Sequence, residues 1–161
     1  MIRRNWIFLG VLLAVASVLA AAQLSSDELK KLLPAGYYFA GQSASVQTRN
    51  SGGLKTAGGK YVLVSLVDNS GYSTGIKEKY QGLFITETKV MFEGATLDPG
   101  QYGFGFKDDK FIVMNVAATD VVTIPSKNDD QLKHPVPLKL EKDGEGYRLY
   151  AGKKYVTLKA D

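Results

Sequence analysis

Hydrophobic residues alternate with polar ones, or form short β-branched and aromatic runs, through most of the chain after Gly36. Side chains alternate between the two faces of a strand, so a period of two predicts strands rather than helices. The runs lie at residues 37–42, 44–48, 61–67, 83–86, 89–92, 101–106, 111–116, 121–124, 138–142, 147–151 and 155–159. Residues 37–161 are therefore predicted to form a mainly antiparallel all-β domain, a sandwich or small barrel of about eight to ten short strands.

Polar or glycine-containing segments separate these runs. Three of them are short enough for tight hairpins, at residues 107–110, 143–146 and 152–153. No second helical pattern is visible, which argues against a parallel sheet with crossover helices. Three longer polar stretches, residues 50–60, 68–82 and 126–137, are predicted to be loops. Loops of this length in a small domain are usually functional or mobile.

A single short helix is predicted within residues 23–36, at the start of the domain. Ser25 and Glu28 have the spacing of a capping box, and Leu24 and Leu29 occupy the positions of a hydrophobic staple. An apolar stripe follows and ends at a proline and a glycine; these residues are Leu29, Leu32, Leu33, Pro34 and Gly36. Because so short a helix is marginal alone in water, we expect its leucines to pack across one open end of a sheet.

The first 22 residues have the organisation of a signal peptide. Arg3 and Arg4 precede the apolar run of residues 7–20, and alanines 20–22 supply the small residues of a cleavage site, which we place after Ala22. The alternative is an uncleaved anchor, although the run is just short of the roughly 20 residues that span a bilayer. The chain is thus expected to be exported to the periplasm or secreted by a bacterium, with no stable membrane span after cleavage.

Composition excludes several kinds of chemistry. The 161 residues include no cysteine and one histidine, which leaves no thiol nucleophile, no cysteine–histidine zinc site and no histidine relay. The net charge of +4 falls to +2 without residues 1–22, because those residues hold two arginines and no carboxylate. No stripe of lysine or arginine is left, so we expect no nucleic-acid partner.

The predicted strand at residues 101–106 contains Gly103 and Gly105 between Phe104 and Phe106. Their spacing does not match a dinucleotide-binding loop, and glycine inside a strand more often marks a close approach of neighbouring groups. We therefore expect either crowded packing over this strand or a bend in it.

A proline-glycine turn precedes the same strand, with the sequence Leu97-Asp98-Pro99-Gly100-Gln101-Tyr102. Gly100 is expected to take a positive φ at the third position of the turn. The segment Leu33-Pro34-Ala35-Gly36-Tyr37 is a weak echo of it, which reflects either recurring turn chemistry or a structural duplication. The turn resembles the L-x-PG-x-Y turn of uncharacterised exported bacterial β-rich proteins and, less closely, of carboxypeptidase-regulatory-like and collagen-adhesin B-type modules. The resemblance implies an exported β domain and transfers no catalytic residue.

Catalytic and metal-binding motifs are weak. Ser43 lies in a near match to a nucleophile elbow, but Ser45 replaces the glycine that the elbow needs, and His134 is the only available base. Asp129 and Asp130 lie in a polar cluster that offers calcium ligands or simply forms a solvated turn, and the ordering of a calcium loop is absent. No cofactor is expected.

Two tyrosines in a polar loop are the candidates for ligand binding. Tyr72 and Tyr80 lie in residues 68–82 with Lys77 and Lys79, a combination able to stack on a ring or sugar while pairing with an anion. The alternative is that these tyrosines fold back and cover the edge of the sheet.

Three function classes follow from these observations. The favoured one is an exported, non-catalytic envelope or secreted binding module for a small molecule, a glycan or an envelope protein. The second is a structural or assembly subunit that pairs through exposed edge strands, with a homo-oligomer as one form of the assembly. A small hydrolase is the third.

Overall fold

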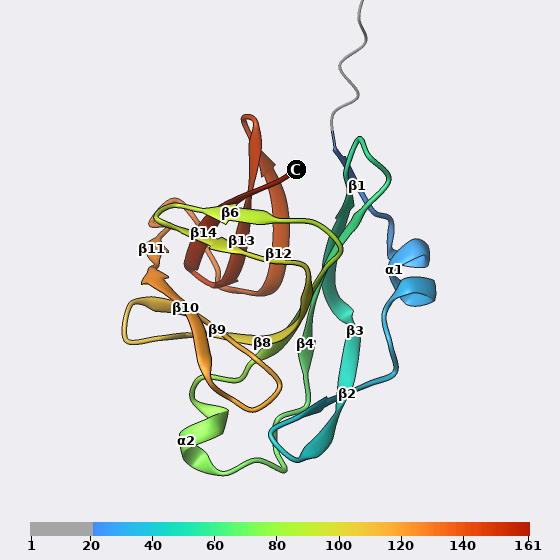
Figure 1. Ribbon diagram of the computed structural model, residues 1–161. Coiled ribbons are helices and arrows are strands. Elements are labelled where there is room, and N and C mark those ends of the chain that lie inside the picture. The colour runs from blue at the N-terminus through green and yellow to red at the C-terminus, as the bar shows by residue number, and fades with distance from the viewer. Residues whose placement is uncertain (1–20) are drawn as a thin grey trace, which may run out of the picture.

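The computed structural model describes residues 21–161, which form two antiparallel β-sheets and two short helices (Figure 1). The first sheet has eight strands in the order β1-β3-β4-β5-β8-β9-β10, with β2 paired to β3. Their bounds are Ala22–Gln23 (β1), Gly36–Phe39 (β2), Gln42–Lys55 (β3), Tyr61–Val67 (β4), Gly82–Thr86 (β5), Gly100–Lys107 (β8), Lys110–Met114 (β9) and Asp120–Pro125 (β10). The prediction of a mainly antiparallel β domain is confirmed.

The second sheet has six strands in the order β12-β13-β14-β6-β7, with β11 paired to β14. Their bounds are Val90–Phe92 (β6), Ala95–Leu97 (β7), Lys127–Asn128 (β11), Val136–Asp143 (β12), Gly146–Gly152 (β13) and Lys154–Ala160 (β14). The described strands exceed the predicted eight to ten mainly because β1, β7 and β11, which have no counterpart among the predicted runs, are only two or three residues long and too short to show a period of two. The two sheets do not close into a barrel.

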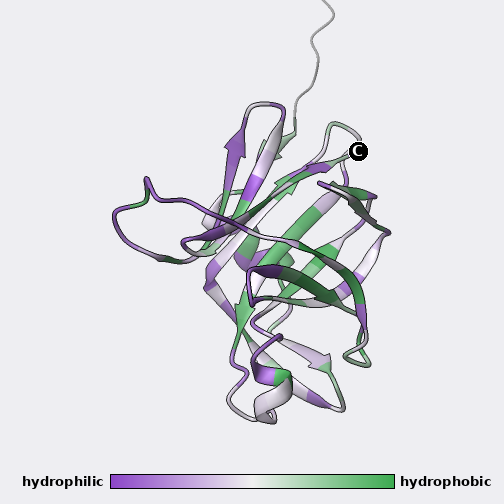
Figure 2. Ribbon diagram, turned by 90° about the vertical axis from the view of Figure 1, so that its left-hand side faces the viewer, coloured by the Kyte–Doolittle hydropathy of each residue, from purple (hydrophilic) through white to green (hydrophobic). Residues whose placement is uncertain are grey.

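The main hydrophobic core lies between the sheets. Phe84, Phe104 and Phe111 of the first sheet are fully buried together with Leu149 and Leu158 of the second. Figure 2 shows hydrophobic positions along the crossing strands and mostly hydrophilic connecting loops. Each such side chain contributes about 1.5–3 kcal/mol on burial, so this layer supplies much of the stabilising free energy.

Helix α1, Ser26–Leu32, has the predicted capping box: Ser25 accepts from the Glu28 backbone, and the Glu28 carboxylate accepts from the Ser25 backbone at 2.8 Å. Its position differs from the prediction. Leu29 and Leu33 pack on Leu63, on the outer face of the first sheet rather than across an open end. A Cβ at Gly53 would lie 2.9 Å from Leu29, so glycine there lets the helix approach the sheet.

Strand β3 extends through much of a segment predicted to be a loop. It continues to Lys55, and the connection to β4 is only residues 56–60. This part of β3 cannot be recognised from the sequence, because Gly52 and Gly53 have no side chains that could show a period of two. Gly52 faces β12 of the other sheet, where a Cβ would lie 2.8 Å from the Leu140 Cβ. At this point β3, a strand of the first sheet, packs directly on β12 of the second sheet.

The predicted hairpin turns are present, whereas the other two predicted loops contain short elements. Asp108 and Asp109 take φ values of 50° and 57° in the β8–β9 turn, and Gly144 and Gly152 take positive φ in the next two hairpins. Residues 68–82 contain a second helix that was not predicted, α2 at Thr74–Lys77, and residues 126–137 contain β11.

The turn before β8 differs in one detail from the prediction. Gly100 is not among the positive-φ glycines of the described residues and already belongs to β8. The Tyr102 hydroxyl instead donates to the Asp98 carbonyl oxygen at 3.0 Å, a bond of the tyrosine-corner kind. Among residues 21–161 the Tyr37 hydroxyl has no such partner, and Leu33 caps a helix whereas Leu97 ends a strand. The two segments are therefore not a structural duplication.

Candidate binding groove

Tyr72 and Tyr80 are buried, contrary to their predicted role as exposed ligand contacts. Their side chains fold back onto the outer face of the first sheet and form a second core with Phe39. The rings of Phe39 and Tyr80 stack at 4.0 Å, and Tyr72 meets Tyr80 edge-on at 5.1 Å. The rings pack on one another and leave no free face for a ligand, so the alternative, that they cover the sheet, describes the structure.

The two lysines of the predicted site do not converge with these rings on a binding surface. Lys79 pairs with Asp120 of β10 at 2.8 Å. Lys77 ends α2, and its carbonyl oxygen accepts from the Asn69 side chain at 3.4 Å. The segment of residues 68–82 therefore covers the outer face of the first sheet, and the ion pair of Lys79 with Asp120 holds it there.

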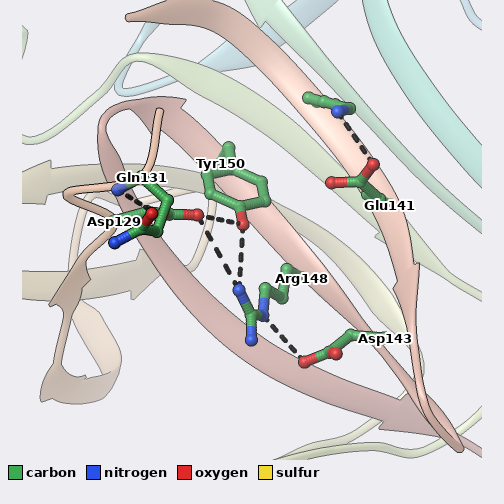
Figure 3. A network of polar contacts seen from close by, with 7 residues as sticks. Asp129, Gln131, Glu141, Asp143, Arg148 and Tyr150 are labelled. Carbon is green, nitrogen blue, oxygen red and sulfur yellow. Dashed lines mark hydrogen bonds and ion pairs between the residues drawn. The ribbon is translucent and has the colours of Figure 1, made fainter. Parts of the chain in front are cut away.

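Asp129 belongs to a polar network on the outer side of the second sheet (Figure 3). Its carboxylate accepts from the Tyr150 hydroxyl at 2.8 Å, and Arg148 lies 3.8 Å away. The hydrogen bond from Tyr150 is the main cause that lowers the pKa of Asp129. Arg148 in turn donates to Asp143 at 2.7 Å and lies over the Tyr155 ring at 4.7 Å.

The carboxylates considered for calcium do not converge on one point. Asp129 is engaged by Tyr150, while Asp130 accepts from the neighbouring Asn128 side chain. Within residues 21–161 no group of three or more His, Cys, Asp or Glu side chains is placed to hold a metal ion. The network holds residues 126–137 on the sheet through Asp129 and Tyr150.

The two residues considered for a hydrolase, Ser43 and His134, do not form a catalytic pair. Ser43 lies inside β3 rather than at a strand-to-helix turn, and both Ser43 and His134 are exposed. In the described part of the chain no hydrogen bond joins them. The geometry that a serine nucleophile needs is not formed.

A groove on the outer face of the first sheet was not foreseen. It lies between α1, β2 and the strands β4 and β5, and we call it the α1–β2 groove; its volume is about 890 Å³. Leu63 and Ile85 form its floor, because alternate residues of β4 and β5 point away from the main core. Figure 1 shows α1 beside β3 and the link from α1 to β2 running along the same side.

Exposed hydrophobic side chains gather at this groove. Among the described residues the large exposed ones are Leu32, Tyr38, Met91, Val116 and Val121. Three of them, Leu32, Tyr38 and Val116, line the groove, with exposed fractions of 36%, 60% and 49%. They come from α1, β2 and the turn after β9, so the fold assembles one apolar patch from distant segments.

The charges of the groove are few and of both signs. Lys31 and Glu87 line it, and neither forms an ion pair with another described residue. The Glu87 carboxylate accepts from the Tyr61 backbone at 2.9 Å, and Lys55 lies over the Tyr61 ring at 5.5 Å. Such a surface suits a ligand that presents apolar groups to the floor and carries little net charge.

Sequence reasoning missed the groove because its parts are far apart in the chain. One local signal was present in Tyr37-Tyr38-Phe39 at the start of the domain. A strand buries one of its faces, so one or two of three consecutive aromatic residues must point outward. Tyr37 and Phe39 are buried and Tyr38 is exposed.

Comparisons with protein-family models, curated proteins and solved structures found no match to this chain. In residues 21–161 no helix is long and apolar enough to cross a membrane. The predicted signal sequence, with Arg3 and Arg4, lies almost wholly outside the described residues. Ala21 and Ala22 are the described part of it, and Ala22 pairs with Lys55 in β1.

Proposed function

We propose that this protein is an exported, non-catalytic binding module that holds an apolar ligand in the α1–β2 groove. The observation that carries the proposal is the gathering of Leu32, Tyr38 and Val116 around one groove with an apolar floor. Soluble proteins rarely expose contiguous apolar surface without a use for it, and ligand sites are concave and mainly apolar.

We also propose a fold class and a location for this protein. The two sheets, which share one core, form a sandwich, and residues 1–22 direct the chain to the periplasm or outside the cell. The groove offers Lys31 and Glu87 as its charged groups and no nucleophile with an adjacent base, which favours binding over catalysis.

The test compares two valines of similar exposure. Val116 lies in the groove and is 49% exposed, whereas Val121 lies on β10 and is 46% exposed. With the neutral apolar dye Nile red as probe, Val116→Asp is expected to weaken binding about fivefold, because it places a charge against apolar surface. Val121→Asp is the control and is expected to bind as the unmodified chain does. Equal dye affinity in both variants, or no dye binding by the unmodified chain, would contradict the proposal.

Assembly through an edge strand is the second candidate. The observation that favours it is β10, a six-residue edge strand of the first sheet with exposed Val121. Asp120 and Pro125 at its two ends and a register shift near Val122 discourage further pairing, so we place it below ligand binding. Size-exclusion chromatography with light scattering tests it, since β10 pairing requires a dimer that Val121→Asp dissociates.

A further inference from the structure

Strand β2 has an unprotected edge beside the groove. Proteins usually protect edge strands by shortness, by charge or by proline. Among the described strands, β1, β7 and β11 are two or three residues long, β10 has an aspartate and a proline at its ends, and β12 contains Pro137 and Lys139. Strand β2 has the sequence Gly-Tyr-Tyr-Phe, without charge or proline.

The register of the β2–β3 hairpin shows which backbone groups lie on this edge. Ala40 and Gly41 form its two-residue turn with φ values of 48° and 85°, as in a type I′ turn. Phe39 pairs with Gln42 next to the turn, and hydrogen-bonded pairs alternate with non-bonded pairs along an antiparallel ladder. The following pair, Tyr38 with Ser43, is therefore non-bonded, and the backbone N–H and C=O of Tyr38 point away from β3.

This outer edge faces the groove. The backbone N–H of Ala40, at the end of the same edge, donates to the Val116 carbonyl oxygen at 2.8 Å. The chain then turns away, because Asn115 and Thr119 close a tight turn and Ala118 takes a φ of 62°. No described residue continues the pairing, so the N–H and C=O of Tyr38 are left beside the apolar floor.

The charges indicate what kind of molecule fits. The groove carries one lysine, Lys31, and one carboxylate, Glu87, neither of them in an ion pair among residues 21–161. A polyanion would meet the carboxylate, and a polycation would meet the lysine. A segment with little net charge, or with single charges of opposite sign near Lys31 and Glu87, complements both.

We propose that the β2 edge is a strand-addition site for an extended polypeptide with apolar side chains at alternate positions. The inference rests on the proposed function and specifies its ligand. The N–H and C=O of Tyr38 pair with the backbone of the added segment. Alternate side chains of that segment lie on the partly exposed Ile85, beside Leu32 and Val116, and those between them face solvent.

The test uses the full chain and end-capped peptides of about six residues, which is the usual length of a strand. In these peptides threonine alternates with leucine, valine or phenylalanine. Binding is measured by fluorescence anisotropy of the labelled peptide. The matched peptide carries N-methyl groups on the amides of one edge, which removes the donors of a strand and keeps its side chains. N-methylation of the pairing edge is expected to weaken binding at least about tenfold, and N-methylation of the other edge is expected to change it little.

A pair of protein variants tests the same bond from the other side. Tyr38→Ala removes the ring and keeps the N–H, whereas Tyr38→Pro removes both, at a position whose N–H is not used by β3. Tyr38→Pro is expected to bind peptide more weakly than Tyr38→Ala, with circular dichroism of each variant as the check of folding. If Tyr38→Pro does not fold, the N-methyl peptides decide alone.

The outcomes separate the two proposals. If Val116→Asp abolishes peptide binding but N-methylation of either edge has no effect, strand addition is wrong and the binding groove stands. If Nile red binds in the groove and no peptide does, the polypeptide ligand is wrong and the apolar groove stands. If neither binds, both fail. A dimer that Tyr38→Pro dissociates would show that the added strand comes from a second copy, which contradicts an extended peptide as ligand.

Discussion

Removal of one hydroxyl group, in Tyr150→Phe, tests the network that fastens residues 126–137 to the second sheet. Tyr150 is 2% exposed, and its hydroxyl lies 2.8 Å from the Asp129 carboxylate and 3.2 Å from an Arg148 nitrogen. Phenylalanine keeps the ring and its packing, so the change isolates the two hydrogen bonds. It leaves both charged groups with one partner fewer.

The expected cost follows from these contacts. A hydrogen bond to a charged group contributes about 1.5–3 kcal/mol, which sets an upper limit of twice that for two bonds. Arg148 keeps its bond to Asp143 at 2.7 Å, and Asp129 keeps the Gln131 backbone N–H at 3.0 Å, so part of the loss is recovered. We expect Tyr150→Phe to lower the free energy of unfolding by about 2 kcal/mol.

Urea unfolding measures this value, with Tyr155→Phe as the matched control. The Tyr155 ring lies under Arg148, but its hydroxyl forms no hydrogen bond to any of the described residues. The control is therefore expected to stay within about 0.5 kcal/mol of the unmodified chain. Equal stability of the two variants would refute the structural role of the Tyr150 hydroxyl.

The pH dependence gives a second readout of the same network. The hydrogen bond from Tyr150 lowers the pKa of Asp129 below its ordinary value of 3.8, so the folded state favours the carboxylate. Its contribution to stability is present above pH 3.8 and is lost as the pH falls through the lower pKa of the folded state. The stability difference between the unmodified chain and Tyr150→Phe should therefore shrink in acid. A difference that grows in acid would contradict this assignment.

Three further predictions concern the packing and the N-terminus. Gly105→Ala is expected to cost about 3 kcal/mol, because its Cβ would lie 2.0 Å from the Lys79 carbonyl oxygen, whereas Gly75→Ala, with nothing within 4 Å, should be neutral in thermal unfolding. Tyr37→Phe is expected to be neutral or to stabilise by about 1 kcal/mol, because the buried hydroxyl has no hydrogen-bond partner in the described part of the chain. Burial raises the pKa of Tyr37 to about 12, so the unmodified chain should lose stability between pH 10.0 and about 12 more steeply than this variant in alkaline unfolding. Mass spectrometry of the exported protein is expected to give Gln23 as the first residue. Tyr147→Phe should then be neutral, because the Ala21 carbonyl that accepts from Tyr147 at 2.9 Å is gone; a cost above about 1 kcal/mol would place the cleavage earlier.

Features fixed by neighbouring residues could be predicted from the sequence. The capping box needs only Ser25 and Glu28, and a two-residue turn needs only residues that tolerate positive φ, such as Asp108 and Asp109. Crowded packing was one of two alternatives predicted for Gly103 and Gly105, and a Cβ at Gly103 would lie 2.6 Å from the Phe39 ring. In each case a few neighbouring residues limit the local structure to one or two solutions.

Features fixed by distant segments could not be predicted. The sequence around Tyr72 and Tyr80 is polar, and only the approach of Phe39 from β2 shows that both rings are covered. The predicted strand ended before the true end of β3. Gly52 and Gly53 let neighbouring segments approach β3 closely, but they have no side chains and so show no alternation of polar and apolar residues. The groove needs α1, β2, β4 and β5 together, and no local pattern describes that arrangement.

The outer face of the first sheet explains why a groove exists at all. Both faces of this sheet are apolar, since Val62, Val64 and Phe84 point into the main core while Leu63, Leu83 and Ile85 point outward. The core shared with the second sheet buries Val62, Val64 and Phe84 on the inner face, whereas the outer face has α1 at one side and the β2 hairpin with residues 68–81 at the other. These covers bury Leu63 and Leu83 and leave Ile85 partly exposed between them. Apolar surface that stays in contact with water costs free energy. A segment that binds over this surface therefore lowers the free energy of the complex. The β2 edge supplies the backbone groups that would orient such a segment, which is why strand addition and the apolar floor belong to one site.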